Sequence, residues 1–194
     1  MDDKETLYDY LRIRRADLLA KLDGLSEYDA RRPMTPTGTN LAGLVKHVAS
    51  VQLGYLGEVF GRPAERRVAW ELPDGAEDDD MWVTPGETVA DVVEFHHYSA
   101  AHADATVEAL ASDAAGVVGW WPEERRHVTL QRILVHLLSE TARHAGHADI
   151  LRETIDGSIG NGASDPNLPG RSPDEWEAFR AKIESAAHAA ASTE

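Results

Sequence analysis

Apolar residues recur at helical spacing along most of the chain, and no long alternating run predicts a sheet. The clearest stripes lie in residues 4–23 and 41–60. One side of the first predicted helix carries Leu7, Leu11, Leu18 and Leu22. One side of the second carries Leu41, Leu44, Val48, Val51 and Tyr55. Two further helices are predicted at 85–110 and 130–155. The pattern therefore predicts an all-α protein.

Residues that start or stop helices separate these segments. Asn40 is expected to cap the second helix, and Gly61 with Pro63 is expected to end it near Phe60. Residues 84–87 (Thr-Pro-Gly-Glu) have the sequence of a capping box with proline at the first helical position. Thr129 is expected to cap the fourth helix, and residues 32–39 form a connection rich in helix breakers.

A long acidic connection, 61–83, joins the second and third helices and holds Trp70, Pro73, the acidic run 77–80 and Trp82. After Ile155 a loop rich in glycine and proline leads to a second capping box at 172–175. This box opens a short helix with Trp176, Phe179 and Ile183 on one face and a frayed alanine-rich end. The sequence predicts a four-helix bundle over residues 1–160, with a long crossover between helices two and three. Residues 161–194 are predicted to form a loop and a short C-terminal helix that packs on the bundle.

Composition narrows the function classes. The 194-residue chain has no cysteine, so that any metal must be held by nitrogen and oxygen. Its formal net charge of -15 opposes binding to nucleic acid, whose affinity comes largely from basic side chains. No apolar run is long enough to cross a membrane, and the acidic N-terminus does not resemble a signal peptide. We expect a cytoplasmic protein that binds neither nucleic acid nor membrane; a homodimer is left open.

The segment 130–151 carries the most informative chemistry. His136, Glu140, His144 and His147 follow at spacings of four, four and three, which places them within about 80° of helical arc. This arc overlaps the apolar stripe, and buried imidazole and carboxylate groups need partners. A bound metal would satisfy them. His47 lies on or near the apolar stripe of the second helix and is therefore the best candidate for a third ligand beside Glu140 and His144.

Two histidines and one carboxylate suit zinc and also iron(II), so the ligand types alone do not choose the metal. A structural interpretation stays open as well, because a histidine near an apolar stripe is commonly just hydrogen-bonded. The pattern E-x-x-x-H is also far looser than H-E-x-x-H. The remaining histidines are predicted to lie on the surface: His96, His97, His102, His127 and His188.

His47 in the second helix, the crossover, and the segment A-R-H-x-G-H-A-D-x-x-R-E within 142–153 together resemble the DinB-like metal-binding four-helix bundles. The branch that the chain resembles is the mycothiol S-transferase group, which is similar to the N-terminal domain of mycothiol-dependent maleylpyruvate isomerase. The resemblance spans roughly residues 5–160. It implies His47, Glu140 and His144 as the metal ligands. Only about 25 residues follow the glycine- and proline-rich loop, so the isomerase's own activity is not expected.

Lesser roles are predicted for neighbouring residues, from the resemblance for those within 136–152 and from spacing and position for Tyr55, Trp120 and Trp121. His136, His147 and Asp149 are expected to surround or orient the ligands. Tyr55, Trp120, Trp121 and Arg152 are candidates for substrate binding, with core packing or a helix salt bridge as the alternative for each.

The implied function is a metal-dependent transferase that activates a low-molecular-weight thiol, mycothiol or a similar one, for attack on an electrophilic small molecule. The divalent metal is expected to be zinc, with nickel or iron as alternatives, and to stabilise the thiolate. A non-catalytic helical bundle that binds a metal or a small molecule, with a role in stress response, is the main alternative. A metal-dependent hydrolase and an iron(II) oxygenase rank below these two.

Overall fold

The computed structural model describes residues 2–66, 68, 76, 78–161 and 165–192. The chain divides into two compact units, Met1–Ile159 and Gly160–Glu194, and each is described by itself. None of the described helices is both long enough and apolar enough to span a bilayer. The predicted crossover residues Trp70, Pro73 and Glu77 lie outside the described residues.

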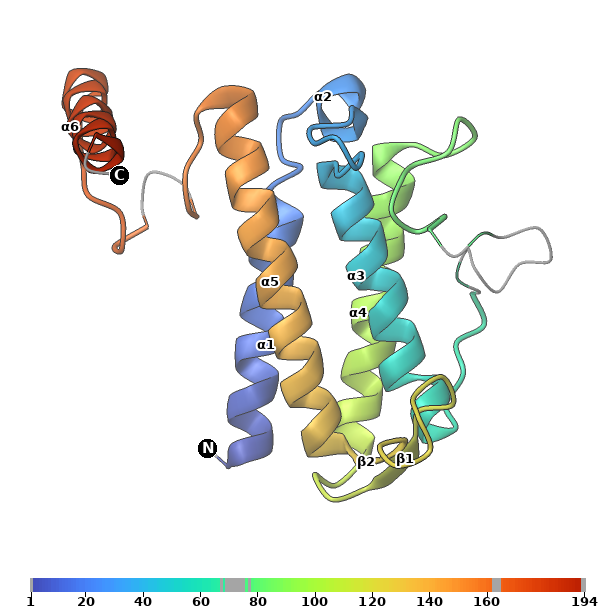
Figure 1. The fold of residues 1–194 in the computed structure, drawn as a ribbon. Coiled ribbons are helices and arrows are strands. Elements are labelled where there is room, and N and C mark those ends of the chain that lie inside the picture. The colour runs from blue at the N-terminus through green and yellow to red at the C-terminus, as the bar shows by residue number, and fades with distance from the viewer. Residues whose placement is uncertain (1, 67, 69–75, 77, 162–164, 193–194) are drawn as a thin grey trace. The chain divides into compact units, whose positions relative to one another are not determined.

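Long helices dominate the described part of the first unit, as Figure 1 shows: α1 (Asp3–Ala20), α3 (Leu41–Leu56), α4 (Val89–Ala109) and α5 (Leu130–Asp156). Helix α1 packs mainly against α5, and α3 packs against both α4 and α5. The connection from α3 to α4 is the segment for which the sequence predicts a long crossover, and the described part of it is called the crossover below. The expected all-α class is confirmed, because strands make up only a small part of the described chain.

The core fills the space between these helices in two groups of buried side chains. One group gathers around Leu44, Val45 and Ala148, and the other around Leu134 and Leu137. Helix α5 contributes to both groups. The buried side chains of α5 therefore fix how this helix is rotated about its axis. The side chains that border this buried stripe are consequently turned toward α3.

Two predicted helix caps are confirmed. The Asn40 side chain accepts a hydrogen bond of 2.8 Å from the Gly43 N–H, and the Thr129 hydroxyl accepts one of 3.3 Å from the Arg132 N–H. Each cap satisfies a backbone donor that has no partner within the first turn of its helix.

The predicted capping box at 84–87 is wrong. Helix α4 begins at Val89 instead, and Thr88 with Asp91 forms its capping box. The Glu87 carboxylate does bond to Thr84, but it also accepts a bond of 2.8 Å from the Lys46 ammonium group of α3. Because this tertiary ion pair fixes Glu87 beside α3, residues 84–87 form a turn before the helix.

Short elements at the ends of the long helices escape the periodicity analysis. Helix α2 (Glu27–Arg31) and the 3-10 helix η1 (Glu58–Phe60) are each a turn or so long. The strands β1 (Ala115–Val117) and β2 (His127–Thr129) form an antiparallel hairpin in which Gly116 pairs with Val128. A side chain at Gly116 would lie 2.8 Å from Phe60 and Val59, so only glycine lets the hairpin approach η1 this closely.

The second unit contains α6 (Pro173–Ala191), which begins at the predicted capping box of Ser172 and Glu175. This helix is longer than predicted, since the alanine-rich stretch is helical as far as Ala191 instead of frayed. The Arg171 guanidinium lies over the rings of Trp176 and Phe179, at 4.6 and 4.1 Å. None of the described residues of α6 is buried. The packing of this segment on the bundle stays a prediction.

Candidate metal centre

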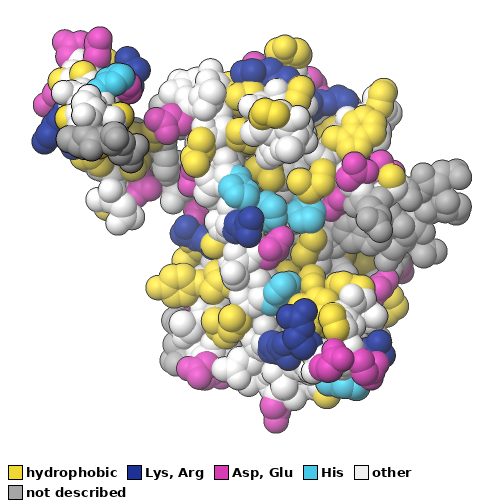
Figure 2. All heavy atoms as spheres, in the orientation of Figure 1, with side chains coloured by type: hydrophobic (Ala, Val, Ile, Leu, Met, Phe, Trp, Pro, Cys, Tyr) yellow, Lys and Arg dark blue, Asp and Glu magenta, His cyan; other side chains and the backbone are white. Residues whose placement is uncertain are grey.

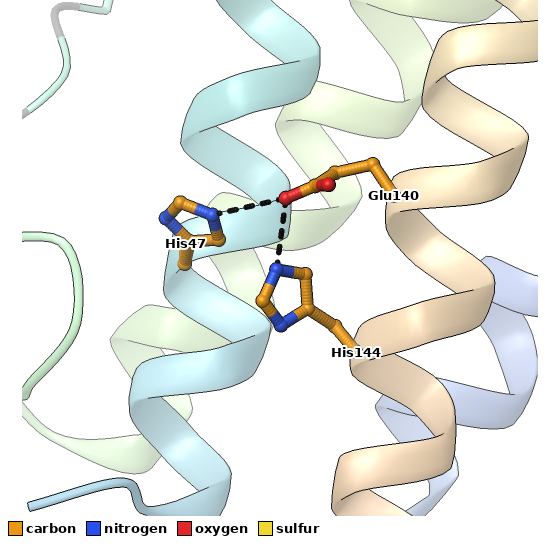
Figure 3. Close-up of side chains that lie close together, drawn as sticks. All are labelled: His47, Glu140 and His144. Atoms are coloured by element: carbon orange, nitrogen blue, oxygen red, sulfur yellow. Dashed lines mark hydrogen bonds and ion pairs between the residues drawn. The ribbon is translucent and has the colours of Figure 1, made fainter. Parts of the chain in front are cut away.

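His47, Glu140 and His144 come together between α3 and α5 (Figure 3). The Glu140 Oε1 atom lies 2.9 Å from His144 Nε2 and 3.5 Å from His47 Nε2. One possible ligand atom from each residue lies within 4.8 Å of the other two. The three side chains are 21%, 29% and 12% exposed for His47, Glu140 and His144, respectively. They therefore form a partly exposed cluster of two imidazoles and one carboxylate, in the spacing that the sequence predicts.

The core packing of each helix explains why these side chains meet. On α5, Leu137, Thr141 and Ala148 are buried, which turns Glu140 and His144 toward the neighbouring helix. On α3, His47 is half-buried between two buried neighbours, so its ring lies at the edge of the α3–α5 contact. Figure 2 shows histidine side chains gathered on the face formed by these helices, with acidic and hydrophobic side chains beside them.

Asp80 completes the cluster from the crossover, and the sequence analysis did not identify it as a site residue. Asp80 is 2% exposed, and its Oδ2 atom lies 2.5 Å from the Nδ1 atom of His47. The adjacent Met81 anchors this part of the crossover, since its carbonyl accepts a bond from Asn40 and packs against Gly43. Asp80 therefore orients the His47 ring with its Nε2 atom directed at Glu140. The acidic run at 77–80 was the only signal of this residue in the sequence.

Electrostatics divide the three groups. Burial lowers the pKa of His47, but the bonds and charges of Asp80 and Glu140 raise this pKa by more, so that it lies above its usual value. Burial raises the pKa of Glu140, whereas His144 and His47 lower it, and the net shift is downward. Glu140 is therefore ionised at neutral pH.

The pKa of His144 shifts the other way from that of His47. Burial lowers the pKa of His144, the bond to Glu140 opposes this, and His47 and His147 add to the downward shift. Its Nδ1 atom is buried and has no hydrogen-bond partner in the described part of the chain. The Nδ1 atom of His47 is therefore bonded to the Asp80 carboxylate, whereas the Nδ1 atom of His144 has no such partner in the described residues. The orientation of the His47 ring is thus fixed by one more hydrogen bond than that of the His144 ring.

The three donors fit a divalent ion. Ligand atoms arranged tetrahedrally at about 2.1 Å from zinc are separated by roughly 3.4 Å. The separations of Glu140 Oε1 from the two imidazole nitrogens, 2.9 and 3.5 Å, are close to this, and the two imidazoles offer nitrogens within 4.8 Å of each other. A carboxylate hydrogen-bonded behind one imidazole is also the usual support of a histidine ligand. Two nitrogens and one oxygen suit zinc, nickel and iron(II) alike, so the geometry does not choose between them.

An aromatic cluster lies along the same two helices. Tyr55, two turns after His47, is 8% exposed, and its hydroxyl accepts bonds from the indole N–H groups of Trp120 and Trp121, at 3.3 and 2.9 Å. The centre of the His136 ring lies 4.7 Å from the centre of the Tyr55 ring and 5.2 Å from that of the Trp121 ring. The structure therefore brings four of the predicted site residues together, one turn of α5 from Glu140.

Three other predicted site residues have different surroundings. Asp149 forms an ion pair of 2.6 Å with the buried Lys21, and Arg152 donates bonds of 2.8 Å to the carbonyls of Lys21 and Asp23 at the end of α1. The His147 ring is exposed beside His144, with 5.5 Å between ring centroids. The structure thus joins Asp149 and Arg152 to α1, and the roles predicted for them in the site stay untested.

Three of the other histidines follow the predictions, one does so in part, and one does not. His97, His127 and His188 are exposed, as predicted, and His102 is partly buried against the Arg62 carbonyl at 2.7 Å. The prediction for His96 is wrong, because this residue is only 3% exposed. Its side chain continues a buried stripe of α4 that consists of Val92, His96, Ser99, Ala103 and Thr106, and three of these five residues are polar.

The fold and the cluster define a helical protein with a candidate centre of two histidines and one carboxylate. Residues 6–157 match the family model described as mycothiol-S-transferase, and the chain belongs to this family. The predicted resemblance to the DinB-like mycothiol S-transferases is thereby confirmed. A search of curated proteins gave no match.

Proposed function

We propose that this protein is a metal-dependent transferase that joins mycothiol, or a similar thiol, to an electrophilic small molecule, on a DinB-like four-helix bundle. The convergence of His47, Glu140 and His144 carries the proposal, in a chain that belongs to the mycothiol S-transferase family. The chain has no cysteine, so the nucleophilic sulfur would arrive with the thiol.

His47, Glu140 and His144 would hold a divalent ion, for which we propose zinc. When bound, this ion supplies a positive charge that lowers the pKa of a thiol and so favours the nucleophilic thiolate. Asp80 fixes the orientation of the His47 ring. Among the three proposed ligands only Glu140 would be negatively charged, so a divalent ion together with these ligands would carry a net positive charge toward an incoming thiolate.

The transferase proposal is tested with the zinc-loaded protein, mycothiol and a panel of electrophiles. Conjugate formation, followed by mass spectrometry, is expected from the wild type. We expect at least a 100-fold loss in His144→Ala, because the variant lacks one of three ligands and holds the ion poorly. His188→Ala, which changes an exposed histidine of α6, is the control and should keep wild-type activity. Full activity of His144→Ala would contradict the proposal.

The second candidate is a non-catalytic bundle that binds a metal or a small molecule. Its support is that Glu140 already lies within 3.5 Å of a ring nitrogen of both histidines, so the three side chains contact one another without an ion. In this case no thiol would be consumed with any electrophile, even when the protein is saturated with zinc. A hydrolase or an iron(II) oxygenase would instead show water-dependent cleavage or oxygen consumption.

Asp80→Asn provides a separate test of how the ligands are held. The amide cannot supply the negative charge behind His47, and loss of such a partner typically weakens metal binding by about 10- to 100-fold. We therefore expect the Kd for zinc, measured by competition with a chromophoric chelator, to rise within this range. Asp78→Asn, two residues earlier and exposed, is the matched control. Equal affinities in the two variants would show that Asp80 does not support a ligand.

A further inference from the structure

The candidate metal centre is closed on one side and accessible on the other. One turn before His47, Gly43 is buried under Met81, whose carbonyl oxygen lies 1.9 Å from where a side chain on Gly43 would begin. One turn after His144, Ala148 is fully buried. The described residues therefore cover the strip between α3 and α5 in this direction. In the other direction the same strip leads from the centre toward Tyr55, two turns after His47 on α3.

In that direction the surface is built of aromatic rings. Trp120 is 53% exposed, and the six-membered part of its indole lies over Gly54, with 3.5 Å to the position of a side chain there. The centres of its ring and of the Tyr55 ring lie 5.1 Å apart in an edge-to-face arrangement. Since both indole N–H groups are bonded to the Tyr55 hydroxyl, the rings are held in place and Trp120 keeps its exposed surface toward solvent.

Polar groups flank these rings. Burial lowers the pKa of His136, which is therefore uncharged at neutral pH, and its ring lies between Tyr55 and Trp121. The Arg132 guanidinium lies 5.3 Å from the centre of the Trp121 ring. A flat apolar surface bordered by hydrogen-bonding groups suits a neutral molecule that has both C–H faces and hydroxyl groups.

We propose that Tyr55, Trp120, Trp121 and His136 form the binding surface for the sugar-like body of the thiol, with a carbohydrate ring stacked on Trp120. This inference rests on the proposed function. Mycothiol has such a body, an amino sugar joined to inositol. The cysteine attached to this body carries the sulfur atom. Gly54 follows His47 by seven residues, which corresponds to about 10 Å along a helix. A body tied to a sulfur atom at the centre spans this distance, whereas an electrophile needs only to reach the sulfur.

The kinetic test compares mycothiol with N-acetylcysteine, a thiol that lacks the sugar-like body. Trp120→Ala is expected to raise the KM for mycothiol about tenfold, which is the upper range for one aromatic contact. The kcat, the metal content and the KM for N-acetylcysteine should stay at wild-type values. Trp120→Phe, which keeps a ring but loses the N–H group, should restore most of the binding. Trp176→Ala, outside the residues matched by the family model, is the control.

A binding measurement separates this inference from the transferase proposal. The amino sugar–inositol body without its cysteine is titrated into metal-free protein by calorimetry. We expect binding to the wild type and to Glu140→Ala, and loss of binding in Trp120→Ala. A protein that binds the body but transfers no thiol would refute the transferase and leave the binding surface standing. The inference is overturned if the body does not bind the wild type, or if Trp120→Ala changes the KM for the electrophile alone.

Discussion

Glu140→Ala is expected to remove the metal from the purified protein. In structural zinc sites about 10–16 kcal/mol of binding is shared by four ligands, so loss of one ligand should weaken binding by roughly two to three orders of magnitude. Glu140 is also the only anionic member of the proposed set, and its Oε1 atom is the one that faces both imidazoles. Elemental analysis of untagged protein should find about one equivalent of zinc or nickel in the wild type and almost none in the variant.

Two further variants make this result specific. Glu140→Gln keeps the size of the side chain but not its charge, and should also lose most of the metal. Glu153→Ala, an exposed carboxylate on the same helix, should retain one equivalent. His47→Ala should behave like Glu140→Ala, although its ring is on another helix. Metal that stays bound in Glu140→Ala would mean that the ion has other ligands. Absence of metal from the wild type, even with excess zinc, would favour the non-catalytic bundle.

The meeting of His47, Glu140 and His144 could be predicted because local regularity fixes which way these side chains point. The spacing of four residues between Glu140 and His144 places both on one face of any helix, and the apolar stripe of α5 determines where this face points. The apolar side chains on either side of His47 likewise determine where the face of α3 that carries His47 points. The family resemblance then joined the two helices, since periodicity alone does not say which helices are neighbours.

Asp80 could not be predicted in the same way. It lies in a connection without periodicity, and its position depends on the packing of Met81 on Gly43 and on the bond from Asn40 to the Met81 carbonyl. The same limit applies to β1 and β2, whose strands are too short for an alternating pattern to be recognised. Tertiary contacts, and not local preferences, decide both features.

His96 shows how a polar residue within a buried stripe hides that stripe. Val92, His96 and Ala103 lie on one side of α4, but histidine and serine at the inward positions weaken the apolar signal. Both ring nitrogens of His96 are buried, and in the described residues neither has a hydrogen-bond partner. Burial, together with the charge of Arg15 and the neighbouring His97, lowers the pKa of His96 to about 4.

This lowered pKa predicts a loss of stability in mild acid. An unfolded chain binds a proton at histidine below pH 6.5 or so, whereas the folded protein takes up this proton only near pH 4. The stabilising contribution of neutral His96 is therefore complete above about pH 6.5 and falls as the pH drops toward 4. A shift of this size corresponds to roughly 3 kcal/mol over the whole window.

His96→Met tests the prediction, because the variant fills a similar volume with no group that binds a proton. Urea unfolding of metal-free protein is followed by circular dichroism at about pH 8 and pH 5.5. We expect the advantage of the variant over the wild type to grow by about 1.4 kcal/mol between these conditions, since roughly one pH unit of the window is crossed. His97→Met, the exposed neighbour, should show no such change. A pH-independent difference for His96→Met would mean that His96 reaches solvent or a partner and titrates as it does in the unfolded chain.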